Sequence, residues 1–543
     1  MARSNEIGAA DYVVVGAGSA GCVLANRLSE CGTHDVALLE YGGSDIGPFI
    51  QMPAALSYPM NMKRYDWGYR SEPEPCLGGR QLAAPRGKVL GGSSSINGLV
   101  YIRGNSKDFD AWADKGAAGW SGRHVAPYFR RLENVEGADP AIRGTDGPMH
   151  ITVPQQQHPL DQAFMAAAQE AGFSRSQDCN GLHQDGFGPM DQTIWKGRRW
   201  SAANAYLKPA LNRDNLTLYR GLACRILWTG TKATGVELLH KGKRRILHAR
   251  KEVILSASVF NSAKLLLLSG VGASDDLSRL GIETVSERRG VGQNLQDHLE
   301  IYLQMRCTEP ITLRRYMNPV SKGLAGLQWL LTKTGIGASN HFETAGFVRL
   351  DETASYPDAQ YHFLPAAIRY DGSQPVRAHG FQAHVGPGRT TARGRVRLKS
   401  ADPMAAPSIQ FRYMSSAADW EAFRKCVRLT REIFSQPSLK VFSGGEIAPS
   451  ADCRSDEDID AFVAREVESA YHPCGTCRMG QADDPDAVVD PNCRVIGVEG
   501  LRVVDSSVFP NITNGNINAP TMMLAEKAAD HILGRPLLPA DTA

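Results

Sequence analysis

The chain has 543 residues, of which 42% are hydrophobic, so its length and composition predict two sizeable hydrophobic cores. The 60 basic and 57 acidic side chains leave a net charge of only +3, which argues against a large electrostatic surface for nucleic acid. No signal peptide is predicted, and the longest apolar run, at 265–268, is too short for a transmembrane segment. Eleven cysteines without regular spacing favour a reduced, intracellular protein. A cytoplasmic location is therefore predicted, with peripheral association at the inner face of the membrane as an open alternative.

A strand–helix–strand unit near the N-terminus predicts a dinucleotide-binding fold. An apolar run at 11–15 predicts a buried strand, and apolar side chains at helical spacing follow it over 20–28. A second apolar run at 36–39 ends in Glu40. This acid lies about 20 residues beyond Gly21, where the partner of a ribose hydroxyl pair is expected.

Three glycines between the first strand and the helix complete this fingerprint. Gly16 allows a tight turn, Gly18 lets the backbone approach a pyrophosphate, and Gly21 lets the helix pack closely on the strand. The free amides at the start of the helix would face the phosphates with the positive end of the helix dipole. A tight turn without a ligand is the alternative, but it does not explain why Glu40 closes the second strand.

A second glycine-rich stretch, at 85–104, contains two glycines followed by three serines. Such a loop of unhindered amides and hydroxyls suits a phosphate or a flat polar ring, and the stretch is too apolar for a linker. Residues 87–110 resemble the first signature of the glucose–methanol–choline (GMC) oxidoreductases, FAD-dependent enzymes that act mostly on alcohols. Residues 251–272 resemble the second signature, with departures at Ala257 and Asn261.

The C-terminal part extends the resemblance, which covers residues 10–535 approximately. It implies an α/β fold with a Rossmann-like FAD-binding domain (GMC fold) and an α+β substrate-binding domain built on an antiparallel sheet. A final helix is expected over 522–533. The implied FAD-binding domain is discontinuous and comprises 8–156, 200–305 and 470–535. The implied substrate-binding domain comprises 157–199 and 306–469.

The resemblance implies that His472 is the catalytic base and that Asn516 is its partner. A histidine suits this role because its unperturbed pKa lies near neutrality, and an asparagine can donate a hydrogen bond to a developing alkoxide. The flavin would accept the hydride. The residues implied to bind the cofactor are Gly16, Gly18, Ser19, Gly21, Glu40, Gly91, Gly92, Ser93, Asn97, Gly98, Ala223, Asp505, Ser506 and Asn518.

Two residues of the glycine–serine loop depart from the choline oxidase branch of the family. That branch links its flavin covalently to a histidine, where this chain has Ile96, and Gly98 replaces a serine that contacts the substrate. These departures imply non-covalent FAD and a dehydrogenase rather than an oxidase. Its external electron acceptor would be a quinone, the respiratory chain or an artificial dye.

Within the family the strongest resemblance is to the bacterial choline dehydrogenase branch, through the runs 51–56, 63–67, 337–343 and 361–365. The predicted reaction is oxidation of a small primary alcohol to the aldehyde, with choline giving betaine aldehyde. A quaternary ammonium donates no hydrogen bonds, so its site needs aromatic faces and a carboxylate. The residues implied to bind the substrate are Trp67, Tyr471, Glu343 and His379.

Two other functions stay open. One is a dehydrogenase of another primary alcohol, either aliphatic or a hydroxy acid. The other is an FAD-containing hydroxynitrile lyase, although such lyases usually have a second histidine where this chain has Asn516.

The pair Cys474-x-x-Cys477 beside His472 admits a dithiol or half of a zinc site. A zinc site needs four ligands, and no second Cys/His pair follows nearby. Packing cysteines are therefore predicted, and no metal is predicted.

Overall fold

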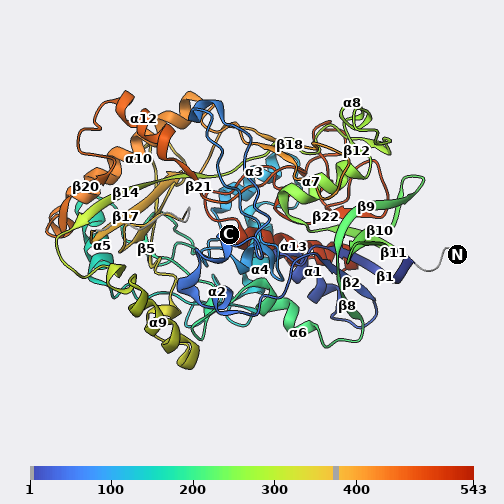
Figure 1. Ribbon diagram of the computed structural model, residues 1–543, viewed down its shortest axis with the longest axis horizontal. Coiled ribbons are helices and arrows are strands. Elements are labelled where there is room, and N and C mark those ends of the chain that lie inside the picture. Colours follow the sequence, from blue (N-terminus) through green and yellow to red (C-terminus); the bar gives the residue numbers. More distant parts are fainter. Residues whose placement is uncertain (1–4, 371–377, 543) are drawn as a thin grey trace.

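The computed structural model describes residues 5–370 and 378–542, and two sheets side by side dominate it (Figure 1). The first sheet contains the predicted strand–helix–strand unit. Its central strand β1 (Glu6–Val15) pairs in parallel with β2 (Val36–Glu40) on one side and with β11 (Lys243–Leu255) on the other. The strand β1 therefore begins five residues earlier than the apolar run at 11–15 indicated.

Distant parts of the chain complete the first sheet, whose strand order is β8-β2-β1-β11-β10-β9. β8 lies parallel to β2, and β22 lies parallel to β11. The other two strands pair antiparallel, since β9, β10 and β11 follow one another as a meander. The bounds of these strands are β8 (Leu216–Arg220), β9 (Leu222–Thr229), β10 (Lys232–His240) and β22 (Leu501–Val503).

Helices from the two ends of the chain pack together beside this sheet. α1 (Ser19–Ser29) contacts α13 (Asn518–Leu533), and α4 (Gly122–Leu132) packs on α13. Almost every residue of α13 is buried. Because of this packing, the C-terminal helix carries the end of the chain back to the dinucleotide fingerprint. It begins four residues before the predicted start at 522.

The second sheet is antiparallel, as predicted, and has the strand order β20-β14-β17-β16-β15-β5, with β21 paired to β14. The predicted domain boundary between 305 and 306 falls inside β14, which belongs to this sheet. α5 (Pro159–Glu170) and α10 (Ala417–Ser435) cover one face. The strand bounds are β5 (Gly186–Pro189), β14 (Leu299–Cys307), β15 (Thr344–Val348), β16 (Ala359–Leu364), β17 (Gly380–Pro387), β20 (Ser443–Ala448) and β21 (Glu468–Ser469).

Side chains alternate between the two faces of this sheet, so one face packs in the core and the other faces the pocket. Odd-numbered residues of β14, β16 and β17, such as Ile301, Phe363 and Val385, pack in the core with α5 and α10. Even-numbered neighbours must therefore point to the opposite face. Polar side chains occupy that face at Glu300, His362 and His384, and all three line the pocket described below.

The predicted fold class is confirmed by these two sheets and by the solved structures compared below. None of the helices in the described part of the chain combines the length and apolar character needed to cross a bilayer.

Candidate active site

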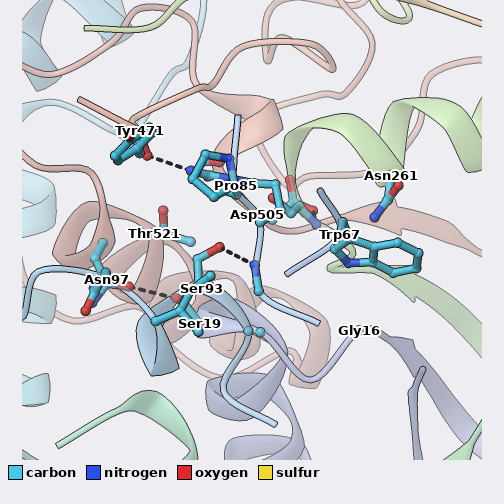
Figure 2. A pocket seen from close by; sticks show the side chains of 18 of the residues that line it. Gly16, Ser19, Trp67, Pro85, Ser93, Asn97, Asn261, Tyr471, Asp505 and Thr521 are labelled. Atoms are coloured by element: carbon cyan, nitrogen blue, oxygen red, sulfur yellow. Dashed lines mark hydrogen bonds between the residues drawn. The ribbon is translucent and has the colours of Figure 1, made fainter. Parts of the chain in front are cut away.

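One pocket connects the first sheet to the polar face of the second. Its lining includes Gly16, Gly18 and Glu40 at one end and His472 and Asn516 at the other. Figure 2 shows residues from widely separated parts of the chain around this pocket, among them Ser19, Ser93, Asp505 and Thr521. The fold thus brings the predicted cofactor residues and the predicted catalytic pair into one space.

The glycines at the first end form a cradle that larger residues would fill. A Cβ on Gly92 would lie 2.7 Å from the Cα of Gly18, so the two predicted glycine loops touch. A Cβ on Gly16 would lie 2.5 Å from the carbonyl oxygen of Ser256, and one on Gly21 would lie 1.8 Å from the carbonyl oxygen of Gly16. Gly16 and Gly21 keep the turn tight, and Gly18 at the helix start stays open to a ligand, as a bound pyrophosphate requires.

Glu40 closes this end of the pocket with a buried carboxylate. Its oxygens accept hydrogen bonds from the backbone amides of Ala17 (2.8 Å) and Gly42 (2.6 Å). Burial raises the pKa of Glu40, and those amides oppose the shift. The carboxylate therefore ties the end of β2 to the glycine turn, and it lines the place where the ribose is expected.

Most of the other predicted cofactor residues also line the pocket. Ser19 donates to Asn518 Oδ1 (2.7 Å), and the amide of Gly87 donates to Ser93 Oγ (3.1 Å, Figure 2). Gly21 and Gly91 are outside the pocket lining; the amide of Gly91 donates to the carbonyl of Ala17 (2.7 Å). The remaining lining residues of the predicted set are Gly92, Asn97, Gly98, Ala223, Asp505 and Ser506.

Cys474 and Cys477 lie in the hydrophobic core of the first sheet, and both side chains are fully buried. Burial raises the pKa of both thiols, which keeps them protonated. This placement agrees with the predicted packing role. Within 5–370 and 378–542, no three His, Cys, Asp or Glu side chains form a group that could hold a metal ion.

A chain of hydrogen bonds fixes the imidazole of His472. Asn516 accepts from Gln360 Nε2 (2.9 Å) through Oδ1, so its Nδ2 faces His472 Nε2 at 2.8 Å. On the other side His472 Nδ1 lies 3.1 Å from His298 Nδ1, and His298 Nε2 lies 3.1 Å from the carbonyl oxygen of Gly388. A second anchor is Asp297, which accepts from the backbone amide of His472 (2.7 Å).

The Gly388 carbonyl and the Gln360 amide, at the two ends of this hydrogen-bond chain, determine which nitrogen of each histidine carries the proton. A carbonyl oxygen only accepts, so His298 must donate from Nε2 and accept at Nδ1. His472 then donates from Nδ1 to His298, which leaves the lone pair of its Nε2 on the side of Asn516. An alcohol that reaches His472 Nε2 would therefore also meet the amide of Asn516.

The surroundings of His472 also keep it in its basic form. Burial lowers the pKa of His472 well below its ordinary value, and the neighbouring His298, His362 and Arg86 add to the shift. Burial likewise lowers the pKa of His298 to about 4. Both imidazoles are therefore neutral at physiological pH, and His472 is ready to accept a proton.

Two of the predicted substrate residues lie outside the pocket lining. Phe342 points into the pocket, whereas the adjacent Glu343 points away and interacts with the backbone of Gln156. His379 bonds instead to Thr312 Oγ1 (2.8 Å). Adjacent residues in extended chain face opposite ways, so a position next to the pocket is no guarantee of contact. We therefore assign neither residue a contact with the substrate.

The other two predicted substrate residues do line the pocket, at different places. Tyr471 lies next to His472, and its carbonyl oxygen accepts from Arg86 (2.7 Å). Trp67 stacks on Tyr41, the residue that follows Glu40, with ring centroids 5.3 Å apart, and it lies near Asn261 in Figure 2. The indole therefore belongs to the nucleotide end of the pocket rather than to the His472 end.

A carboxylate among aromatic rings was missed by the sequence analysis. Glu300 on β14 lines the pocket, and its carboxylate lies 3.3 Å from His384 Nδ1 on β17. Burial would raise the pKa of Glu300, but His384 and its hydrogen bond lower it, so the group stays ionised. The run from Asp297 to Glu300 held a usable signal, because His298 and Glu300 are two residues apart and share one face of an extended chain.

Aromatic rings cluster around His384, the partner of this carboxylate. The ring centroids of Phe342 and His384 are 5.5 Å apart, and those of Tyr370 and His384 are 5.7 Å apart. Phe342 also contacts His362, with centroids 6.0 Å apart. All of these side chains line the pocket, which therefore has an anionic, aromatic compartment along with the His472–Asn516 pair.

Comparison with known proteins places this site in a family. Two models described as GMC oxidoreductase match residues 10–300 and 390–525. The oxygen-dependent choline dehydrogenase of Brucella anthropi is 58% identical over 533 residues, covering 98% of this chain and 97% of that protein.

Solved structures agree with the family match. Pyridoxine 4-oxidase from Mesorbium loti is 31% identical with a TM-score of 0.88, covering 97% of this chain and 99% of the other. A formate oxidase is 26% identical with a TM-score of 0.91, covering 98% and 99% respectively. The glycine cradle, Glu40 and the continuation of the pocket from them to His472 fit a bound flavin dinucleotide. The chain belongs to the GMC oxidoreductase family, and it is an FAD-dependent enzyme that oxidises alcohols.

Proposed function

We propose that the enzyme oxidises choline to betaine aldehyde, with His472 as the base and Glu300 as the group that recognises the cation. The observation that carries this proposal is an ionised, largely buried carboxylate that lines the same pocket as aromatic rings and the His472–Asn516 pair. The name of the Brucella anthropi relative supports the choice of substrate. Anaerobic addition of choline to the holoenzyme tests the proposal through the flavin spectrum.

The proposed reaction starts at the hydroxyl group of the alcohol. His472 Nε2 accepts the hydroxyl proton, and His298 holds the ring in the tautomer that makes this possible. Asn516 Nδ2, 2.8 Å from that nitrogen, donates to the alkoxide as negative charge develops on the oxygen. In the holoenzyme, FAD bound in the glycine cradle would supply the acceptor for the hydride of the carbinol carbon.

A site for choline has to bind a quaternary ammonium group without the help of hydrogen bonds from it. Its methyl groups offer no N–H donors, so the cation is held by electrostatic attraction and by aromatic faces. Glu300 supplies the negative charge, and Phe342 and Tyr370, whose rings contact each other, supply aromatic faces in the same pocket. Tyr471 adds a further ring beside the base. This arrangement replaces the role that the sequence analysis gave to Glu343.

The proposal includes an external oxidant that takes the electrons from the reduced flavin. The relative from Brucella anthropi is named as oxygen-dependent, so dioxygen is a candidate beside a quinone, the respiratory chain or a dye. A cytoplasmic location stays a prediction from the sequence. Cell fractionation with an antibody against the chain would test it.

We expect the FAD to be bound without a covalent link. Ile96 lines the pocket where the choline oxidase branch has its linking histidine, and an isoleucine side chain has no nucleophilic atom. Acid precipitation of the holoenzyme should therefore release the yellow cofactor into the supernatant. Colour that stays with the pellet after denaturation and washing would contradict this expectation.

A further inference from the structure

The surface helix α9 (Pro319–Thr332) exposes its apolar side chains to solvent. Only Trp329 is buried among its residues. A leucine-rich helix of this kind usually hides its apolar face in a core. Four side chains instead form an apolar ridge, namely Val320 (71% exposed), Leu324 (63%), Leu327 (53%) and Leu331 (76%).

The spacing of the apolar ridge shows that it points away from the protein. Its members are four, three and four residues apart, which places them on one face of a helix. Trp329 lies on the opposite face, where its indole nitrogen donates to the carbonyl oxygen of Gly197 (2.6 Å). α9 lies at an outer edge of the molecule (Figure 1). A continuous exposed apolar stripe marks an interaction surface.

The charged side chains in this stretch of the sequence are all basic. Between Pro310 and Phe342 the sequence contains no Asp or Glu. The same stretch contains four basic residues, and the turn that holds Trp329 adds two exposed ones. These six cations, the basic surround, are Arg314, Arg315, Lys322, Lys333, Lys196 and Arg198.

The apolar surface continues onto a neighbouring segment. η2 (Pro53–Ala55) packs against η8 (Ile336–Ala338), which follows α9. On either side of η2, Phe49 and Tyr58 are 41% and 42% exposed, and their ring centroids lie 5.4 Å apart. Residues 47–64 also contain no acidic side chain, and they end in two cations, Lys63 and Arg64.

We propose that the apolar ridge and its basic surround dock the enzyme on an anionic lipid bilayer. A helix with an apolar face and flanking cations lies in the plane of such an interface, with its apolar side chains among the acyl chains. The negative headgroups attract the surrounding cations. A second copy of the chain fits less well, because pairing this face with itself would oppose like charges. One protruding helix also offers little of the roughly 800 Å² per partner of a stable interface.

The test is sedimentation of the full-length holoenzyme with lipid vesicles. One set contains phosphatidylcholine alone, and the other contains phosphatidylcholine and phosphatidylglycerol in equal parts. We expect binding to the anionic vesicles and a decrease with added salt. The variant Leu324→Ser/Leu327→Ser/Leu331→Ser should weaken partitioning by at least about tenfold, since it removes most of the exposed apolar area. Lys322→Glu should weaken it by about fivefold or more.

A matched control separates this surface from exposed apolar residues in general. The variant Leu182→Ser/Met404→Ser/Val441→Ser changes side chains that are 78%, 53% and 69% exposed, and it should bind vesicles like the unmodified enzyme. The flavin spectrum and the rate with a soluble dye should stay unchanged in both triple variants, which shows that they fold. The proposal is wrong if the enzyme ignores anionic vesicles or if the ridge variant still binds them. It is also wrong if the ridge variant instead dissociates a dimer.

Discussion

His472→Ala should bind FAD and fold normally but reduce its flavin with choline about 10²–10⁴-fold more slowly, as expected for loss of a general base. The substitution removes the lone pair of His472 Nε2. The hydrogen-bond chain from Gly388 to Gln360 holds this lone pair on the side of Asn516. Stopped-flow measurement of flavin absorbance without oxygen gives the rate directly. Because burial lowers the pKa of His472, its imidazole is uncharged at neutral pH and can accept a proton.

Two variants control this experiment. His183→Ala removes an exposed histidine and should react like the unmodified enzyme. Asn516→Ala should slow the reaction less than His472→Ala, because it removes one hydrogen bond to the developing charge and leaves the base in place. A near-normal rate in His472→Ala would take His472 out of the mechanism.

Glu300→Gln should remove much of the preference of the enzyme for a cationic substrate. The uncharged isostere 3,3-dimethylbutanol has nearly the shape of choline, so the ratio of the two kcat/KM values isolates the electrostatic contribution. A desolvated cation on aromatic faces gains about 2 kcal/mol, which predicts a preference for choline of about thirtyfold or more. Replacing the carboxylate by an amide should lower that preference by at least about tenfold.

The reaction with 3,3-dimethylbutanol is the internal control for this variant. Glu300 also pairs with His384, so a structural disturbance would slow both alcohols, whereas loss of cation recognition slows only choline. Glu309→Gln changes an exposed glutamate and should leave the ratio as it was. An unchanged ratio in Glu300→Gln would mean that this carboxylate does not recognise the substrate.

Local sequence rules predicted the cofactor end of the pocket well. Gly16, Gly18 and Glu40 lie within one strand–helix–strand unit, so their spacing along the chain already fixes how they meet in space. The antiparallel second sheet was also predicted, through the family resemblance. The predicted domain boundary between 305 and 306 falls inside β14, and no change in composition marks a boundary in this part of the sequence.

The substrate end was harder to predict because its residues meet only through the pairing of strands. Glu300, His362 and His384 belong to three strands, and only their shared face in the sheet brings them together. Glu343 was chosen from a matching run, yet its neighbour Phe342 takes the place facing the pocket. The side to which a residue points changes with every step along an extended chain, so an error of one position reverses it.

The central claim is that choline gives its hydride to the flavin in this pocket, and anaerobic mixing of the oxidised holoenzyme with choline tests it most directly. We expect the yellow absorbance to bleach, with betaine aldehyde formed in an amount equal to the reduced flavin. A hydroxynitrile lyase would leave the spectrum unchanged. A dehydrogenase for another primary alcohol would bleach with that alcohol and not with choline. An unchanged spectrum after addition of choline would therefore contradict the account.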